Sequence, residues 1–147
     1  MSLLFKQIYK REDLNPKNYE FACALRDEVD PNLELDFTGY DLLLPNNQYN
    51  YFEIYSGNNI IGFVAFFVLK HFYGQLIFAT LDNIYLVPKY RGFAGGRVIK
   101  EVERLARYKG AEEFWWEPHP DTPMEQCFKN RKEYLKGGCT YIKRFHE

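Results

Sequence analysis

The chain has 147 residues, which is enough for one domain with a single core but leaves no room for a second domain of ordinary size. Hydrophobic residues make up 46% of it and charged residues 27%, close to the average of globular proteins, which excludes a disordered or collagen-like chain. The net charge of −1 lacks the broad positive field of a non-specific nucleic-acid binder, so nucleic acid is not an expected partner.

A strand and a helix are predicted at the start of the chain. Leu3 to Tyr9 favours a strand, and the next element begins with Asn15, a helix-capping residue, followed by Pro16 at the first helical position. Apolar residues then follow at helical spacing: Phe21, Ala22, Leu25 and Val29. Pro31 ends this helix, and residues 32–50 are expected to be irregular with one helical turn at most.

The middle of the chain predicts three strands. Tyr51 to Tyr55 alternates, residues 56–59 have turn chemistry, and Ile60 to Leu69 is an unbroken apolar run, so these segments predict a hairpin that leads into a central strand. After a turn that ends near Gly74, a further strand runs from Leu76 to Val87 and stops at Pro88.

Helical and extended segments then alternate. Gly96 to Lys109 carries an amphipathic stripe and is closed by Gly110, and Phe114 to Trp116 predicts a short buried strand. Residues 119–123 are expected as a loop, 124–136 as a second amphipathic helix and 139–145 as a final strand. This order, with a β-α-β unit from Val87 to Phe114, predicts one domain of the α/β (α+β) class with a mixed sheet, and the 18% of aromatic residues suits such a core.

The cysteines and histidines indicate no metal site. Cys23, Cys127 and Cys139 are odd in number and form no C-x-x-C pair, which argues for reduced thiols rather than disulfides or a zinc knuckle, and the three histidines lack ligand spacing. The longest apolar run is about half a membrane span and the first residues lack a signal peptide's apolar stretch, so we expect a cytoplasmic protein without a membrane partner.

Charge is unevenly distributed along the chain. Residues 27–41 contain six acids and no base, whereas residues 89–109 contain seven bases and two acids. Within the second segment, Val87 to Arg97 connects a buried strand to a basic helix through small residues. Successive backbone N–H groups there could wrap an anion such as a pyrophosphate at the positive end of the helix, although a plain turn without ligand is the alternative.

These residues resemble the GNAT superfamily of N-acetyltransferases. Residues 91–96 follow its acetyl-CoA pattern [Arg/Gln]-x-x-Gly-x-[Gly/Ala] except that Ala94 stands at the first Gly. Residues 81–93 are similar to the fourth strand of polyamine acetyltransferases, and residues 134–139 match the ending Tyr-x-x-x-Gly-[apolar]. With the order of elements, the resemblance spans Leu3 to Phe145. It implies a mixed, mostly antiparallel central sheet flanked by helices on both faces. Compact relatives of this kind also occur in phages.

The resemblance implies acetyl-CoA as co-substrate and a set of residues that would bind it. The backbone amides of Phe93 to Arg97 would hold the pyrophosphate with the side chains of Arg91 and Arg97 nearby, and the strand near Leu86 and Val87 would splay from its neighbour and contact the pantetheine arm. The implied binding residues are Leu86, Val87, Arg91, Gly92, Phe93, Ala94, Gly95, Gly96 and Arg97.

Two catalytic residues are implied as well. Asp82 would deprotonate the acceptor amine directly or through water, and the Tyr134 phenol would protonate the departing thiolate. Asp82 with Asn83 could instead satisfy backbone groups, and Tyr134 could be a core ring. His119 is an alternative base or a surface loop residue, and Cys127 has no activating base near it in the sequence.

The predicted function is N-acetyltransferase, with transfer to a primary amine by direct attack in a ternary complex. The acidic segment lies where relatives build the acceptor side, which favours a cationic acceptor such as a polyamine, a small amine or a lysine-bearing peptide, unless those acids only solvate a loop. The alternative is a degenerate GNAT-fold protein with a structural or interaction role, because Ala94 and Gly95 depart from the pattern and Cys139 replaces an aromatic residue. Nine residues follow Gly138, so we expect a shortened sheet or a homodimer that completes it.

Overall fold

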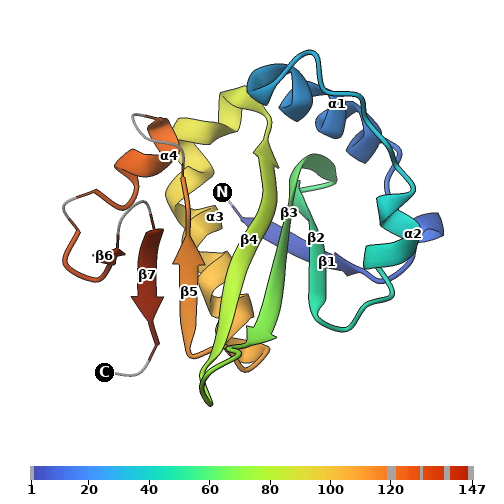
Figure 1. Cartoon of the computed structure of the whole chain (residues 1–147). Coiled ribbons are helices and arrows are strands. Elements are labelled where there is room, and N and C mark those ends of the chain that lie inside the picture. Colours follow the sequence, from blue (N-terminus) through green and yellow to red (C-terminus); the bar gives the residue numbers. More distant parts are fainter. Residues whose placement is uncertain (1, 119–121, 130, 138–139, 146–147) are drawn as a thin grey trace. The chain divides into compact units, whose positions relative to one another are not determined.

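The computed structural model describes residues 2–118, 122–129, 131–137 and 140–145. Within these ranges, seven strands form one sheet with the hydrogen-bonded order β1-β2-β3-β4-β5-β7-β6, which confirms the predicted mixed, largely antiparallel α/β architecture (Figure 1). The chain divides into two compact units: a first unit of Met1–Phe66 with Asp82–Phe93, and a second unit of Phe67–Leu81 with Ala94–Glu147. A single domain over residues 1–147 remains a prediction.

The strands of the first unit follow the predicted boundaries closely. β1 (Leu3–Ile8) pairs antiparallel with β2 (Tyr49–Ser56), in a register that runs from Leu3 opposite Ser56 to Ile8 opposite Tyr51. Gly57, with a φ of +61°, begins the tight turn from β2 into β3 (Asn59–Lys70), because a positive φ strains residues that carry a Cβ.

A close approach to the end of β4 (Ile77–Leu86) fixes the identity of Gly62 in β3. A Cβ added at Gly62 would lie 2.1 Å from the carbonyl oxygen of Tyr85, a distance that no side chain can occupy. The neighbouring Val87 N–H donates to the carbonyl of Ile61 at 2.8 Å. The glycine therefore lets the strand that carries Asp82 approach β3.

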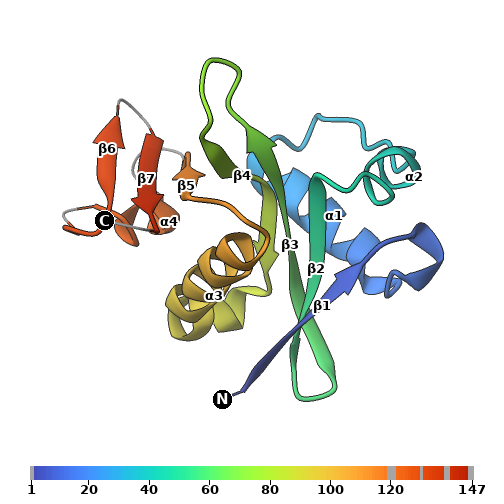
Figure 2. The same ribbon diagram turned by 90° about the horizontal axis from the view of Figure 1, so that it is seen from below.

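Two helices flank β2 in the first unit. After a 3₁₀ turn (Arg11–Asp13), α1 (Lys17–Val29) begins where the Asn15 side chain accepts a hydrogen bond from the Lys17 N–H, as the capping signal predicts. The irregular segment contains the single helical turn that was expected, α2 (Gly39–Leu43). Both helices lie on the same side of β2 (Figure 2).

A fully buried carboxylate, Glu53 of β2, ties α1 to the sheet. It accepts hydrogen bonds from the Asn15 N–H and the Asn18 Nδ2, both at 2.6 Å, and from the Tyr55 hydroxyl at 2.8 Å. A buried carboxylate needs several such donors to offset its lost hydration. This end of the helix is therefore held by polar contacts.

Helix α3 (Pro88–Tyr108) corrects one prediction, because it begins eight residues before the expected start at Gly96. The buried stripe extends back in the sequence at four-residue spacing: Ala94, Val98, Val102 and Ala106 are at most 1% exposed. The neighbouring glycines hide this stripe in the sequence. The predicted end is confirmed, since Gly110 adopts a φ of +100° just past the helix.

The second unit contains the rest of the sheet, with β5, β7 and β6 side by side (Figure 1). β5 (Glu113–Trp116) pairs parallel with residues 78–80 of β4, which confirms the predicted β-α-β unit. β7 (Thr140–Arg144) pairs antiparallel with β5 and with β6 (Leu135–Gly137), so a short closing hairpin is present. Part of Cys139 to Phe145 was thus predicted correctly, and Cys139 itself lies outside the described residues.

The helix predicted over residues 124–136 is wrong. Only α4 (Pro123–Gln126) forms, capped by the Thr122 hydroxyl, and the chain then turns towards β6. The Phe128 ring packs on Trp116 at 5.3 Å and on Tyr134 at 4.9 Å. Residues six positions apart lie about 120° apart around a helix, so burying both Phe128 and Tyr134 in one aromatic cluster requires the helix to end.

Candidate functional site

A cleft of about 290 Å³, here named the Asp82 cleft, lies within the first unit. Its lining comes from α1, the segment after it, α2, and the strands β2, β3 and β4. Polar and aromatic side chains from the strands include Tyr49, Tyr51, Phe63, Asp82 and Asn83. A concave, mostly apolar site with a few polar groups is the usual form of a small-molecule site.

The Asp82 carboxylate is exposed at the wall of this cleft. Its Oδ2 accepts a hydrogen bond from the Tyr49 hydroxyl at 3.1 Å and a longer one from the Asn83 Nδ2 at 3.4 Å. Burial and the adjacent Asp82 charge raise the pKa of Tyr49 well above the ordinary range of a phenol. Tyr49 therefore stays protonated and orients the carboxylate.

Stacked rings form the apolar side of the cleft. The Tyr51 ring stacks on Phe63 with centroids 5.3 Å apart and meets Tyr40 edge-to-face at 5.8 Å. The Tyr51 hydroxyl donates to the Asn18 side chain at 2.6 Å, and burial raises its pKa above the ordinary phenol range. These rings present apolar faces, with the Tyr51 hydroxyl directed to α1.

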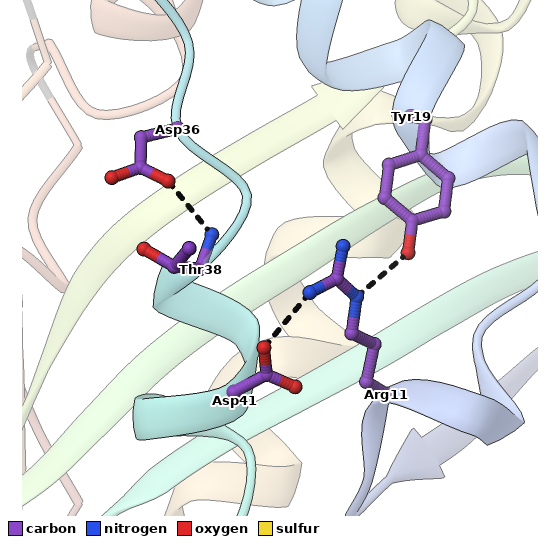
Figure 3. Close-up of polar contacts among 5 residues, drawn as sticks. All are labelled: Arg11, Tyr19, Asp36, Thr38 and Asp41. Atoms are coloured by element: carbon purple, nitrogen blue, oxygen red, sulfur yellow. Dashed lines mark hydrogen bonds and ion pairs between the residues drawn. The ribbon is translucent and has the colours of Figure 1, made fainter.

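The acidic segment of residues 27–41 is largely occupied by contacts within the chain. Figure 3 shows two of them: Asp41 accepts from Arg11 at 2.8 Å, and Asp36 accepts the Thr38 N–H at 3.0 Å. The Thr38 backbone N–H lowers the pKa of Asp36 below its ordinary value. Arg11 also donates to the Tyr19 hydroxyl at 3.2 Å.

Three further acids of this segment have partners as well. Asp27 pairs with Arg26 at 2.8 Å, Glu28 with Arg91 at 2.6 Å, and Asp30 accepts the N–H of Asn32 at 3.0 Å. Five of the six carboxylates thus accept hydrogen bonds from the chain itself. Because three of them pair with arginines, the segment offers less uncompensated negative charge than its sequence suggests.

Arg91, a predicted pyrophosphate neighbour, joins the end of β4 to α1. Its Nε donates to the Leu86 carbonyl at 2.7 Å, its terminal nitrogen pairs with Glu28, and its guanidinium lies 5.2 Å from the Tyr85 ring centroid. The Val87 carbonyl accepts the Tyr90 N–H at 2.9 Å. The backbone groups expected to meet a pantetheine arm therefore have internal partners in this structure.

The predicted pyrophosphate segment, residues 91–97, lies inside α3 rather than in a loop. In an α-helix, the N–H groups beyond the first turn bond to carbonyls four residues earlier, so the amides of Phe93 to Arg97 are not arranged as an anion nest. A Cβ added at Gly92, Gly95 or Gly96 would meet nothing within 4 Å. Packing therefore does not explain why these three positions are glycine.

Tyr134, the predicted catalytic acid, is buried in the second unit. Its hydroxyl donates to the Glu103 Oε2 at 2.7 Å, and the Trp116 Nε1 donates to the same oxygen at 2.9 Å. Burial raises the pKa of Tyr134 above the ordinary phenol range, and the Glu103 carboxylate adds to the shift; burial also raises the pKa of Glu103. Asp82 and Tyr134 belong to different units.

Cys127, the other described candidate, is not arranged as a nucleophile. Cys127 is half-buried, its thiol points to the Pro123 carbonyl at 3.7 Å, and burial raises its pKa, which lowers its reactivity. His119 lies outside the described residues. Within the described ranges, no group of three or more His, Cys, Asp or Glu could hold a metal ion. Across those same ranges, none of the helices has the length and apolar character needed to cross a bilayer.

A family model described as "Acetyltransferase (GNAT) family" matches residues 11–131. The chain belongs to the GNAT acetyltransferase family. A search of curated protein sequences found no match. The matched residues contain the Asp82 cleft, β4 and α3, so the family assignment covers most of the predicted site.

Solved GNAT structures share the fold at low sequence identity. An aminoglycoside acetyltransferase from an uncultured soil metagenomic sample, in complex with sisomicin, has a TM-score of 0.64 and 20% identity over 80% of this chain and 78% of that one. A ribosomal-protein-alanine N-acetyltransferase from Brucella melitensis biovar Abortus 2308 has a TM-score of 0.63 and 18% identity over 87% of this chain and 89% of that one. The aminoglycoside acetyltransferase AAC(6')-Iy, in complex with a CoA-linked bisubstrate analogue, has a TM-score of 0.63 and 18% identity over 86% of each chain.

Sequence reasoning missed most of the cleft of this GNAT chain. Asp82 was identified, but Tyr49 lies outside the strand predicted to start at Tyr51, and nothing in its spacing distinguishes it from a core ring. The rings of Tyr40 and Phe63 come from separate elements and meet only in the folded chain. The high aromatic content was the available signal, although it named no residue.

Proposed function

We propose that this chain is an N-acetyltransferase that transfers the acetyl group of acetyl-CoA directly to a primary amine held in the Asp82 cleft. The observation that carries the proposal is an exposed carboxylate at the wall of an apolar cleft, oriented by the buried phenol of Tyr49. Membership of the family supports the reaction class, and the relative that binds a CoA-linked bisubstrate analogue supports the co-substrate.

The chemistry requires a base in that position. An alkyl ammonium with a pKa of about 10 is mostly protonated at neutral pH, so it must lose a proton before it can attack a thioester. Asp82 accepts that proton directly or through one water. The amine nitrogen then forms a bond to the acetyl carbon while the carbon–sulfur bond breaks; overall one proton ends on the CoA sulfur and one is released to solvent.

The residues of the α3 start fit a role in holding acetyl-CoA. Glycine costs about 1 kcal/mol relative to alanine inside a helix, and packing in the structure does not require glycine at Gly92, Gly95 or Gly96. A ligand that needs close approach of the backbone would supply the reason. Arg91 would exchange Glu28 for the pyrophosphate, which is feasible because exposed ion pairs contribute only about 0–1 kcal/mol.

The role of Tyr134 as the acid remains a separate proposal. Its hydroxyl donates to Glu103, so delivery of a proton to the CoA thiolate would require this hydrogen bond to break first. If Tyr134 serves only as a core ring, the thiolate takes its proton from solvent. A cytoplasmic location, a homodimer and a phage origin likewise stay predictions.

A second candidate function is a degenerate GNAT protein that does not use acetyl-CoA. The specific observation in its favour is the unbroken helix over residues 88–108. In this helix the amides of the expected pyrophosphate segment bond to carbonyls of the same helix. The internal partners of Arg91 and Tyr134 point the same way. Such a protein would keep the fold for an interaction role.

Melting curves with and without acetyl-CoA separate the two candidates. Co-substrate at 100 times its Kd adds about 2.7 kcal/mol to the free energy of unfolding. We expect this stabilisation for the wild type and for the control Gly74→Glu, which makes the same substitution in an exposed turn, but not for Gly96→Glu. A wild type that does not respond would establish the degenerate candidate.

Amine-dependent release of CoA tests the base. We expect Asp82→Asn to lower kcat by about 10²- to 10⁴-fold, the usual contribution of general base catalysis, with little change in stability. Glu34→Gln is the matched control, an equivalent change of an exposed acid outside the cleft lining. Equal turnover of wild type and Asp82→Asn would remove Asp82 from the mechanism.

A further inference from the structure

The charge inside the Asp82 cleft suits a ligand with one positive charge. Three charged side chains line it, Arg26, Asp36 and Asp82, which leaves a net charge of −1. Asp36 already accepts the Thr38 N–H, and Arg26 pairs with Asp27. Asp82, like Asp36, accepts hydrogen bonds from neutral groups, and it is the carboxylate next to the buried Tyr49 phenol, where the proposed reaction needs the ammonium group.

The rest of the lining is apolar and partly open to solvent. Tyr51, stacked on Phe63, forms the buried side. Val29 and Leu33 also line the cleft, and they are 62% and 53% exposed. An apolar ligand group placed between the rings and these two side chains would remove them from water, which is favourable in proportion to the area covered.

The size of the cleft sets a further limit. Its volume of about 290 Å³ lies at the lower end of ligand sites, which span roughly 300–1,000 Å³. A ligand with several ammonium groups would also place its additional charges beside the rings or near Arg26. Both arguments disfavour an extended polyamine or an aminoglycoside in this cleft.

We propose that the acceptor is a primary arylalkyl monoamine, whose ammonium group pairs with Asp82 while its ring lies between Tyr51 and the side chains of Val29 and Leu33. This inference rests on the proposed function, because it names the substrate class of the same cleft. It narrows the cationic acceptor that the acidic segment suggests in sequence to a small monoamine, since five of that segment's carboxylates already accept hydrogen bonds from the chain.

Binding and transfer are measured separately on the full chain. Calorimetry without acetyl-CoA gives the Kd of three probes: 2-phenylethylamine, spermidine and neamine. Release of the CoA thiol with acetyl-CoA present gives kcat/KM for the same probes. We expect 2-phenylethylamine to have a Kd about tenfold lower and a kcat/KM about tenfold higher than both comparators, the discrimination that a small apolar pocket provides.

A pair of variants tests the position of the ring. Leu33→Asp removes an apolar side chain of the cleft and adds a carboxylate. It should therefore weaken the binding of 2-phenylethylamine about fivefold or more and strengthen the binding of spermidine. Leu42→Asp is the matched control: Leu42 is 77% exposed on α2 and is not among the residues that line the cleft. The control should leave the dissociation constants of all three probes unchanged.

The outcomes keep the two proposals apart. Tight binding of 2-phenylethylamine without transfer supports the inference about the cleft and overturns the transferase function. Preference for spermidine or neamine, with transfer, overturns the inference and leaves the transferase function standing. Absence of binding by 2-phenylethylamine, or equal effects of Leu33→Asp and Leu42→Asp, overturns the inference.

Discussion

A single buried carboxylate, Glu103, organises the polar contacts in the core of the second unit. One of its oxygens accepts from both Tyr134 and Trp116, at 2.7 and 2.9 Å. Hydrogen bonds to a charged group contribute more than neutral ones, and a buried carboxylate without them would be costly. These contacts give Tyr134 a structural role independent of any catalytic one.

Replacing Tyr134 by phenylalanine should therefore destabilise the fold. We expect Tyr134→Phe to lower the free energy of unfolding by about 1–3 kcal/mol, because Glu103 loses a donor and keeps only Trp116. Urea titration measures this loss. Tyr108→Phe, at an exposed ring of α3, is the control and should change stability little. An equally small effect at both positions would show that the Glu103 contacts contribute little.

Glu103 should also impose a pH dependence on stability. Burial raises its folded-state pKa above the ordinary value of 4.5, so the folded chain binds this proton more tightly than the unfolded chain does. The resulting stabilisation is complete below about pH 4.5 and is lost as the pH rises through the folded pKa.

The comparison with Glu103→Gln isolates this effect, because glutamine does not titrate. We expect the wild type to lose stability relative to the variant as the pH rises from 4.5 to neutrality. Urea titrations of both proteins across that range supply the measurement. A stability difference that is constant with pH would contradict the assignment.

At the level of single residues, the sequence predicted the site only in part. Asp82 was identified from a resemblance to known strands, and it does line the cleft. Tyr49, which orients it, and Phe63, which stacks beneath the cleft, were not identified. Their roles depend on contacts between distant elements, which local patterns do not encode.

At the level of elements, replacing a glycine by alanine should have opposite effects at a helix position with open space and at a strand position packed against backbone. Gly96→Ala should raise the free energy of unfolding by about 0.5–1 kcal/mol, because alanine favours the helix and a Cβ meets nothing within 4 Å. Gly62→Ala should destabilise by more than 1 kcal/mol, since its Cβ would lie 2.1 Å from the Tyr85 carbonyl oxygen. Thermal and urea unfolding measure both. Destabilisation by Gly96→Ala would contradict the helical assignment at that position.

Strands were predicted better than helices. Alternation and turn residues located β2, β3 and β4 within about two residues, because Gly57, Asn59 and Pro88 lie at or near ends of these strands. The start of α3 was missed because glycines conceal the buried stripe that begins at Ala94. The helix predicted over 124–136 was wrong, because the burial of Phe128 and Tyr134 in one aromatic cluster outweighed the helical propensity of the segment.

At the level of the whole molecule, charge and exposed rings together govern solubility. The chain has a sequence pI near 6.3, so its net charge vanishes close to that pH and electrostatic repulsion between molecules is weakest there. Phe72 and Tyr73, in the turn between β3 and β4, are each 89% exposed. Contacts between such rings favour self-association.

We therefore expect solubility to be lowest near pH 6.3 and to improve in the double variant Phe72→Ser with Tyr73→Ser. Static light scattering over a range of pH measures the attraction between molecules. The variant should keep its stability within about 0.5 kcal/mol of the wild type, because neither ring is buried. Unchanged attraction in the variant would place the contacts elsewhere on the surface.

The exposure of Val29 and Leu33 at the cleft also bears on how such a chain can diverge. Substitutions at exposed positions usually change stability by about 0.5 kcal/mol or less. Truncation of a buried ring such as Phe63 to alanine lowers the free energy of unfolding by about 3–5 kcal/mol. Residues that contact a ligand can thus change one at a time without loss of the fold. New acceptors are then within reach of single mutations, and lineages that share this fold need not share a substrate.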